Sequence, residues 1–272
     1  MPPAILSNLG LAALIVFSLV YLTWIIHLLI KDSSIIDLIW GAGFGLVAGA
    51  LLYTQTERTS YHILLATLPI VWAIRYTNFI WRRNTGNGED PRYTILRERI
   101  KKNGQSWPLF SFFMIYGFQS VSMLLVCAPL IIGMAATNAV EVGILSILGA
   151  LFWLIGFFLE AVADAQLNAF KRKIKDYKGP YEDKPVMDQG LWRYSRHPNY
   201  FGNACMWWGI GLIACSAPWG WIGLIGSAYM NFCLVFLTGK ANNESKMKAR
   251  KAYQDYILRT SGFIPMPPKS ID

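Results

Sequence analysis

Charge is scarce in this sequence. Only 15% of its 272 residues are Asp, Glu, Lys or Arg, whereas 54% are hydrophobic. Several apolar runs approach or exceed the roughly 20 residues that a helix needs to cross a bilayer. The sequence therefore predicts an all-α integral membrane protein that crosses the bilayer several times.

Cysteine and histidine are also few, with four and three residues. The cysteines all lie in apolar segments, at Cys127, Cys205, Cys215 and Cys233. No two of them have the spacing of metal ligands, so we expect buried thiols, no metal site and no disulfide framework. His27 and His62 fit interfacial or core positions, and only His197 lies in a polar motif.

Seven membrane spans are predicted, and the sequence contains no internal repeat. The spans lie at about residues 9–30, 35–53, 61–81, 108–134, 143–163, 203–217 and 219–237. Between the third and fourth spans we expect only a polar stretch, residues 82–106. The fifth helix is expected to extend to about Lys173, and the polar tail is helix-forming to about Arg259.

The basic residues indicate the orientation of these spans. An odd number of spans puts the termini on opposite faces, and 23 of the 25 Lys and Arg residues then share one face. They are Lys31, seven residues in 82–102, eight in 171–196 and seven from 240 onward. The positive-inside rule places that face in the cytoplasm and the N-terminus outside. The net charge of +9 thus reflects topology, and we expect no nucleic-acid partner.

Polar donors gather just before the sixth predicted span. They are Arg193, Tyr194, Ser195, Arg196, His197, Asn199 and Tyr200. An Arg side chain presents a planar fork of donors that suits phosphate, and Pro198 can begin a helix whose free N–H groups attract anions. The segment is either an anion-binding site or a basic loop that contacts lipid phosphate.

Ionisable residues inside predicted spans are costly and therefore suggest function. Arg75 lies in the third span, Asp37 at the start of the second, and Asp164 with Glu160 in the fifth. Arg75 could instead form a structural ion pair with Asp37 or Glu160, and Asp164 could be a carboxylate facing water. Asn168 and Lys171 continue the face of Asp164.

The run Gly-Leu-Trp-Arg-Tyr-Ser-Arg-His-Pro-Asn-Tyr-Phe-Gly, residues 190–202, resembles the signature of the membrane steroid 5α-reductase superfamily. Its bacterial branch of uncharacterised multi-pass proteins is the most similar. The shorter form Arg-His-Pro-x-Tyr-x-Gly also looks like isoprenylcysteine carboxyl methyltransferases and sterol C14 reductases. The ending at residues 256–265 is similar to the closing pattern of the superfamily.

The resemblance implies a seven-helix reductase of one integral membrane domain, residues 1–272, with a cofactor-binding part at about 107–272. It would use NADPH on the cytoplasmic side, in the inner membrane if the chain is bacterial. The substrate would be a membrane-soluble enone, most simply a 3-oxo-Δ4 steroid, another sterol-like lipid or an isoprenoid. No Rossmann glycine motif is needed if the cofactor lies in a helical bundle.

The resemblance also implies roles for single residues. Tyr76 matches the Tyr that holds the ketone oxygen, with Arg75 beside it. The partner carboxylate is Asp37 or Glu57; Glu57 is expected on the outer face, so Asp37 is preferred. The positions that match the cofactor site are Asp164, Asn168, Lys171, Arg172, Arg193, Tyr194, Arg196, His197, Asn199, Tyr200, Asn203, Asn243 and Glu244. Asn203 is a departure, because the superfamily usually has Glu directly after the last Gly of the motif.

A lipid-soluble substrate could enter beside Trp40, Trp72 and Trp207, although these side chains could equally be packing or interfacial anchors. Two other functions fit the sequence. One is a membrane methyltransferase that uses S-adenosylmethionine, which lacks phosphate and does not need so many basic residues. The other is a lipid-binding protein without catalysis, which leaves the cost of Arg75 and Asp37 unexplained.

Overall fold

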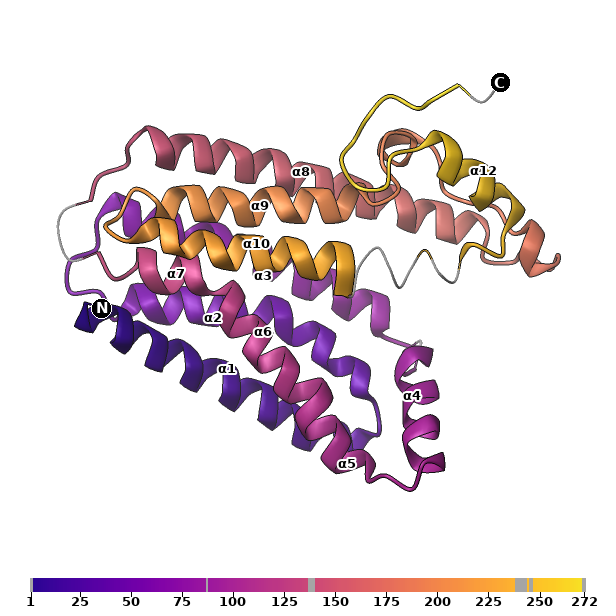
Figure 1. The fold of residues 1–272 in the computed structure, drawn as a ribbon, viewed down its shortest axis with the longest axis horizontal. Helices are drawn as coiled ribbons and strands as arrows, with labels where there is room; N and C mark the ends of the chain where they lie inside the picture. The colour runs from indigo at the N-terminus through magenta and orange to yellow at the C-terminus, as the bar shows by residue number, and fades with distance from the viewer. Residues whose placement is uncertain (1, 87, 137–139, 238–243, 245–246, 271–272) are drawn as a thin grey trace. The chain divides into compact units, whose positions relative to one another are not determined.

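The computed structural model describes residues 2–86, 88–136, 140–237, 244 and 247–270, and every regular element in them is a helix (Figure 1). The first helices are α1 (Pro3–Ile30), η1 (Ser33–Ile35), α2 (Ile36–Tyr53), α3 (Ser60–Asn84), α4 (Pro91–Lys102), α5 (Trp107–Phe110), η2 (Ser111–Gly117), α6 (Phe118–Val126) and α7 (Ala128–Gly133). They are followed by α8 (Ile144–Lys173), η3 (Tyr181–Asp183), η4 (Gly190–Arg193), α9 (Pro198–Ala214), η5 (Gly220–Gly223), α10 (Leu224–Phe232), η6 (Cys233–Leu237) and α12 (Lys251–Arg259). The predicted all-α class is confirmed for these residues.

Six helical stretches are long and apolar enough to cross a membrane. They are Pro3–Ile30, Ser33–Tyr53, Ser60–Asn84, Trp107–Val126, Ile144–Lys173 and Gly220–Leu237. Large apolar side chains on them remain exposed, such as Leu29 at 76% and Phe158 at 64%. Apolar side chains face outward where lipid replaces water, so these helices fit an integral membrane protein.

The sixth predicted span, residues 203–217, overlaps α9, which ends at Ala214 and is not among these six helices. Helix α9 has 17 residues. At 1.5 Å per residue they rise about 26 Å, slightly less than the hydrocarbon core of a typical bilayer. The count of seven spans and the orientation of the termini stay predictions.

The chain divides into two compact units. Unit 1 comprises Met1–Ile147 and Ile210–Gly226, and unit 2 comprises Leu148–Gly209 and Ser227–Asp272. Helices α8, α9 and α10 each have residues in both units.

In unit 1, α2 and α3 form a closely packed antiparallel hairpin. A Cβ atom on Gly41 would lie 2.5 Å from Thr77 Oγ1, and one on Gly45 would lie 2.8 Å from Ala73 Cβ. Only glycine allows this approach, and these pairings bring the start of α2 beside the end of α3. The hairpin thereby places Asp37 near the last turns of α3.

Helix α4 lies where the sequence predicted only a polar stretch. The Asp90 side chain accepts a hydrogen bond from Arg92 N, and Pro91 occupies the first turn, which are ordinary signals for a helix start. Arg97 anchors α4 within unit 1. Its Nη2 lies 2.5 Å from Glu89 Oε1, and its guanidinium carbon lies 5.1 Å from the centroid of the Trp107 ring.

The predicted span at residues 108–134 is divided in the structure. It contains the seven-residue π-helix η2, then α6, and it breaks at Cys127 before α7. Pro129 has no N–H to donate, which explains why one continuous helix does not run through this point.

In unit 2, α8 and α9 approach each other at glycine. A Cβ atom on Gly202 would lie 2.5 Å from the carbonyl oxygen of Gly156 and 2.6 Å from the backbone nitrogen of Glu160. The two backbones are therefore nearly in contact, so short polar side chains reach from one helix to the other.

Candidate functional site

Two Asn–carboxylate pairs join α8 to α9. Asn199 Nδ2 donates a hydrogen bond to Asp164 Oδ1 at 3.1 Å. Asn203 Nδ2 donates to Glu160 Oε2 at 3.2 Å. Each pair lies one helical turn from the other on both helices. We call these four residues the Asn–acid seam.

The seam is buried, and part of its hydrogen-bonding capacity is unused. Glu160, Asp164 and Asn203 are 5%, 6% and 5% exposed. The Oδ1 atoms of Asn199 and Asn203 are both buried and have no hydrogen-bond partner within the described residues. A buried acceptor without a partner costs about 1–3 kcal/mol, so it is normally matched by a ligand, water or protein donor. The seam therefore contains two buried acceptors whose partners do not come from the described residues.

The loop before α9 is fastened to the closing segment, residues 256–266. Backbone and side-chain hydrogen bonds run from Ser195 Oγ to Phe263 O (2.7 Å), from Arg196 N to Ser261 O (2.8 Å) and from Met266 N to Tyr194 O (2.9 Å). The Tyr256 hydroxyl is buried and donates to the backbone oxygen of Trp192. Both stretches that resemble the superfamily thus hold each other in place.

Arg196 is at the centre of this fastening. Its Nε donates to Glu244 Oε1 at 3.0 Å, and Nη1 donates to the carbonyl oxygens of Thr260 at 2.6 Å and Ile257 at 3.3 Å. His197 Nε2 lies 3.2 Å from the same Glu244 oxygen. Burial alone would raise the pKa of Glu244, but the hydrogen bonds from His197 and Arg196 outweigh it and lower that pKa to about 2. Glu244 is therefore ionised at neutral pH and neutralises the arginine.

The structure separates the predicted cofactor residues by burial and by partner. Asp164, Asn199 and Asn203 belong to the seam, while Arg196, His197 and Glu244 form the ion cluster. Lys171, Arg172, Arg193 and Tyr194 have exposed side chains, and Asn168 and Tyr200 are half-buried. Tyr200 stacks on His197 with ring centroids 5.4 Å apart. Asn243 lies outside the described residues.

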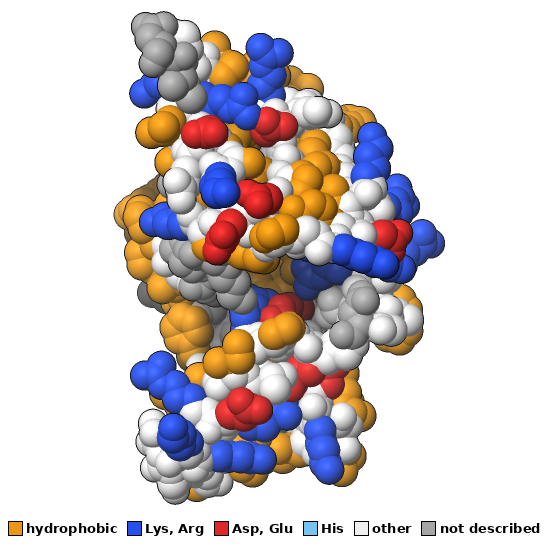
Figure 2. Space-filling model, turned by 90° about the vertical axis from the view of Figure 1, so that its right-hand side faces the viewer, with side chains coloured by type: hydrophobic (Ala, Val, Ile, Leu, Met, Phe, Trp, Pro, Cys, Tyr) orange, Lys and Arg blue, Asp and Glu red, His pale blue; other side chains and the backbone are white. Residues whose placement is uncertain are grey.

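Basic side chains at the surface are visible in Figure 2, where Lys and Arg in blue lie among acidic and apolar side chains. Among the predicted cofactor residues of unit 2, Arg172 and Arg193 have exposed side chains, whereas Arg196 is bound to Glu244. The sequence analysis gave Arg172, Arg193 and Arg196 the same role, cofactor binding.

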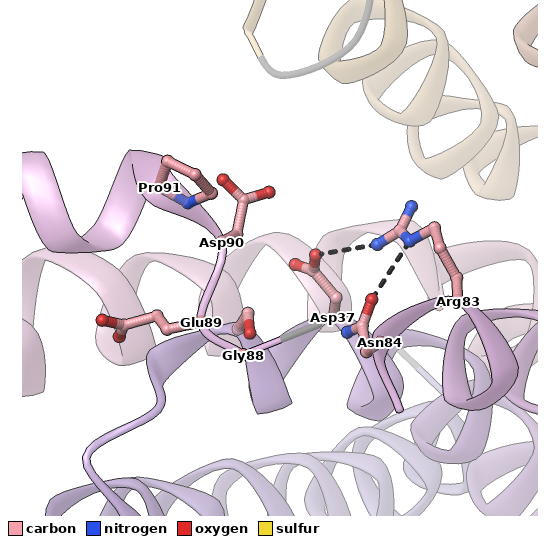
Figure 3. A pocket seen from close by; sticks show the side chains of 8 residues that line it. Asp37, Arg83, Asn84, Gly88, Glu89, Asp90 and Pro91 are labelled. Atoms are coloured by element: carbon pink, nitrogen blue, oxygen red, sulfur yellow. Dashed lines mark hydrogen bonds and ion pairs between the residues drawn. The ribbon is translucent and has the colours of Figure 1, made fainter. Parts of the chain in front are cut away.

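Asp37 lies at a polar cavity of unit 1. The cavity has a volume of about 190 Å³ and is lined by the start of α2, the end of α3 and residues 88–91. Figure 3 shows the Asp37 carboxylate directed toward Arg83, whose Nη2 lies 3.4 Å from Asp37 Oδ2. Arg92 Nη2 lies 3.7 Å from the same oxygen. The ion pairs of Asp37 in the described structure are thus with these two arginines.

Tyr76 lies on the same hairpin, about one turn from Asp37. A Cβ atom on Gly41, one turn after Asp37, would lie 2.8 Å from Tyr76 Cδ1. The Tyr76 ring stacks on Trp72 with centroids 4.8 Å apart, and the Arg75 guanidinium lies 5.9 Å from the Phe79 ring centroid. Glu57 is exposed in the loop after α2, at the opposite end of the hairpin. Of the two candidate carboxylates, Asp37 is therefore the one near Tyr76.

The three tryptophans predicted to contact substrate differ in burial. Trp72 and Trp207 are 3% and 1% exposed. Trp40 is half-buried, and its Nε1 donates to Gln119 Oε1 at 2.7 Å. Trp40 and Trp72 both pack against Phe44, with ring centroids 5.7 and 6.1 Å from it.

Sequence reasoning gave no binding role to Glu160 and did not single out Gln119. The position of Glu160 four residues before Asp164 was a usable signal, because it puts both carboxylates on one face of α8. Nothing in the sequence indicates that Gln119 contacts Trp40, since the two residues belong to different spans.

Comparison with known proteins identifies the family but no activity. The chain is 25% identical over 285 residues to "Uncharacterized protein C594.04c" of Schizosaccharomyces pombe, covering 90% of this chain and 77% of that protein. No solved structure matches. Residues 23–260 match the family described as "Protein of unknown function (DUF1295)", which is associated with the steroid 5α-reductase-like superfamily. Because the match spans most of its length, the chain belongs to the DUF1295 family.

Proposed function

We propose that this protein is an NADPH-dependent membrane reductase that transfers hydride to the carbon–carbon double bond of a membrane-soluble enone, such as a steroid-like or isoprenoid ketone. The observation that carries the proposal is the pair of unpartnered acceptors in the Asn–acid seam. Asn199 lies within the superfamily signature, and Asn203 directly follows its last glycine. Seven spans, a cytoplasmic cofactor site and an external N-terminus belong to the same proposal.

The residues of the seam fit the cofactor. The orphan Oδ1 atoms of Asn199 and Asn203 require donors, and NADPH offers a carboxamide NH₂ group and ribose hydroxyls. The exposed side chains of Arg172 and Arg193 can neutralise phosphate, whereas Arg196 is already bound to Glu244. We therefore assign cofactor binding to the seam and to exposed basic residues, and a positioning role to Arg196.

When bound, NADPH supplies the hydride. Reduction of an enone places negative charge on the ketone oxygen, and a tyrosine hydroxyl can stabilise that charge. We assign this role to Tyr76. Asp37 is held by Arg83 and Arg92, so its carboxylate can orient polar groups near Tyr76. The hydrophobic substrate would be taken from the surrounding membrane lipid.

The first test is ligand-dependent thermal stability of the detergent-purified protein, with NADPH, NADH and S-adenosylmethionine compared. A ligand that binds only the folded state adds about 2.7 kcal/mol at a hundredfold excess over its Kd. We expect stabilisation by NADPH, reduced in Arg172→Ala and Arg193→Ala. Since both side chains are exposed, these variants should leave the stability of the free protein unchanged.

The second test is enone-dependent oxidation of NADPH. We expect Tyr76→Phe to retain stabilisation by NADPH and to lose turnover, while Tyr53→Phe, at a tyrosine that is 79% exposed, retains both. Turnover in Tyr76→Phe equal to that of the unmodified protein would refute the role of Tyr76.

S-Adenosylmethionine is the alternative ligand, because its ammonium and hydroxyl groups are also donors for the seam. Stabilisation by S-adenosylmethionine alone would replace the reductase with a methyltransferase. If none of the three ligands stabilises the protein, a lipid-binding function without catalysis becomes the better explanation.

A further inference from the structure

Unit 1 contains a second pair of buried polar atoms without partners, apart from the residues discussed above. The Tyr116 side chain is 0% exposed, and its hydroxyl has no hydrogen-bond partner within the described residues. The His27 side chain is 1% exposed, and its Nε2 likewise has none. A buried polar atom of this kind normally has a partner, so two adjacent exceptions call for an explanation.

The two side chains lie face to face. Their rings stack with centroids 4.9 Å apart and planes inclined by 24°. His27 comes from α1 and Tyr116 from the π-helix η2. Short π-helical segments are frequent at functional sites, and this one directs Tyr116 into the interior of unit 1.

Neighbouring hydrogen bonds determine what His27 Nε2 and the Tyr116 hydroxyl require. His27 Nδ1 lies 2.6 Å from the carbonyl oxygen of Trp24, which can only accept, so Nδ1 carries the proton and Nε2 is an acceptor. The side chain of Trp24 donates a hydrogen bond from Nε1 to Ser111 Oγ at 3.1 Å, which connects α1 to η2. The site thus pairs one fixed acceptor, His27 Nε2, with one donor, the Tyr116 hydroxyl.

We propose that His27 and Tyr116 bind a hydroxyl group, supplied by a trapped water molecule or by a membrane-soluble alcohol. A hydroxyl is the smallest neutral group that can accept from Tyr116 and donate to His27 at once. A ketone or ether oxygen could satisfy only Tyr116. An anion that carries no proton could accept from Tyr116 but could not donate to His27 Nε2.

The test is the thermal stability of the detergent-purified protein, measured without NADPH, so that its outcome does not depend on the proposed reductase activity. We expect Tyr116→Phe to lower Tm by about 2–4 °C, because it removes a hydrogen bond to the bound hydroxyl. We also expect this decrease to disappear in the His27→Phe background, which keeps the stacked ring but lacks the acceptor. Tyr61→Phe is the matched control, since Tyr61 is equally buried and its hydroxyl donates to Gly133 O at 3.3 Å in either background.

The opposite result is equally clear. If nothing is bound, Tyr116→Phe removes an unsatisfied donor and should leave Tm unchanged or raise it. That outcome, or an equal decrease in both backgrounds, would overturn the proposal.

A second arm identifies the source of the hydroxyl. Dodecan-1-ol, its methyl ether and dodecane are added to the unmodified protein and to Tyr116→Phe. Stabilisation by the alcohol alone, lost in Tyr116→Phe, would identify a membrane-soluble alcohol as the ligand. Coupling between His27 and Tyr116 without any response to the alcohol would identify bound water.

Discussion

Replacing Arg196 with alanine tests whether the superfamily motif is partly structural. The side chains of Arg196 and Glu244 are only 9% and 12% exposed. The guanidinium satisfies the Glu244 carboxylate and the carbonyl oxygens of Thr260 and Ile257. All of these acceptors would lose a charged donor in Arg196→Ala.

The expected loss of stability is large. Removing one partner of a buried ion pair costs about 3–5 kcal/mol, because the remaining charge is left uncompensated. At about 2–4 °C per kcal/mol, Tm should fall by on the order of 10 °C. The measurement is thermal unfolding of the free protein in detergent, followed by fluorescence.

Arg193→Ala is the matched control, because Arg193 lies in the same loop with an exposed side chain. Its Tm should stay close to that of the unmodified protein. If Arg196→Ala also unfolds within a degree or two of the unmodified protein, the fastening described here contributes little. Arg196 would then return to the group of candidate phosphate ligands.

Two further predictions concern unit 2. Glu244 has a pKa of about 2 in the folded protein, against an ordinary value of 4.5. It therefore stabilises the fold above about pH 4.5 and loses that contribution, on the order of 3 kcal/mol, as the pH falls toward 2. In Glu244→Gln, Tm should vary less with pH between 4.5 and 2, and an unchanged dependence of Tm on pH would contradict this role of Glu244. Gly202→Ala should destabilise the protein by about 1–3 kcal/mol, because its Cβ would meet the backbone of Gly156 and Glu160. The control is Gly10→Ala in α1, where no atom lies within 4 Å of the added Cβ. This variant should unfold at the same temperature as the unmodified protein or slightly higher. Equal effects of the two substitutions on stability would refute the close approach of α8 and α9.

The sequence predicted the membrane helices well because their signal is local. A continuous apolar run needs no knowledge of its neighbours, and six of the runs correspond to helices long enough to span a membrane. The fifth predicted helix extends to Lys173 as expected. Helix α4 was missed because its residues are mostly polar, so that the start signal at Asp90–Pro91 had no apolar run to support it.

The candidate site was predicted less completely, because its contacts join distant parts of the chain. The motif located Asn199 and Arg196 but not their partners. The carboxylate that binds Arg196 is 48 positions away, and the one that binds Asn199 is 35 positions away. Composition and spacing therefore assigned one role, cofactor binding, to side chains that the structure divides between a buried seam, an ion cluster and the surface.

The seam also changes the meaning of Asn203, where the superfamily resemblance leads us to expect Glu. Asn203 Nδ2 lies 3.2 Å from Glu160 Oε2, and both residues are 5% exposed. With Glu at 203, two carboxylates would meet in this buried position, and they could not both be ionised without a cation or a shared proton. Asparagine instead donates to Glu160 Oε2, and its own Oδ1 has no partner within the described residues. In this chain the carboxylate beside position 203 therefore comes from Glu160 on α8, so Glu160 and Asn203 should be considered together in any comparison with the steroid reductases.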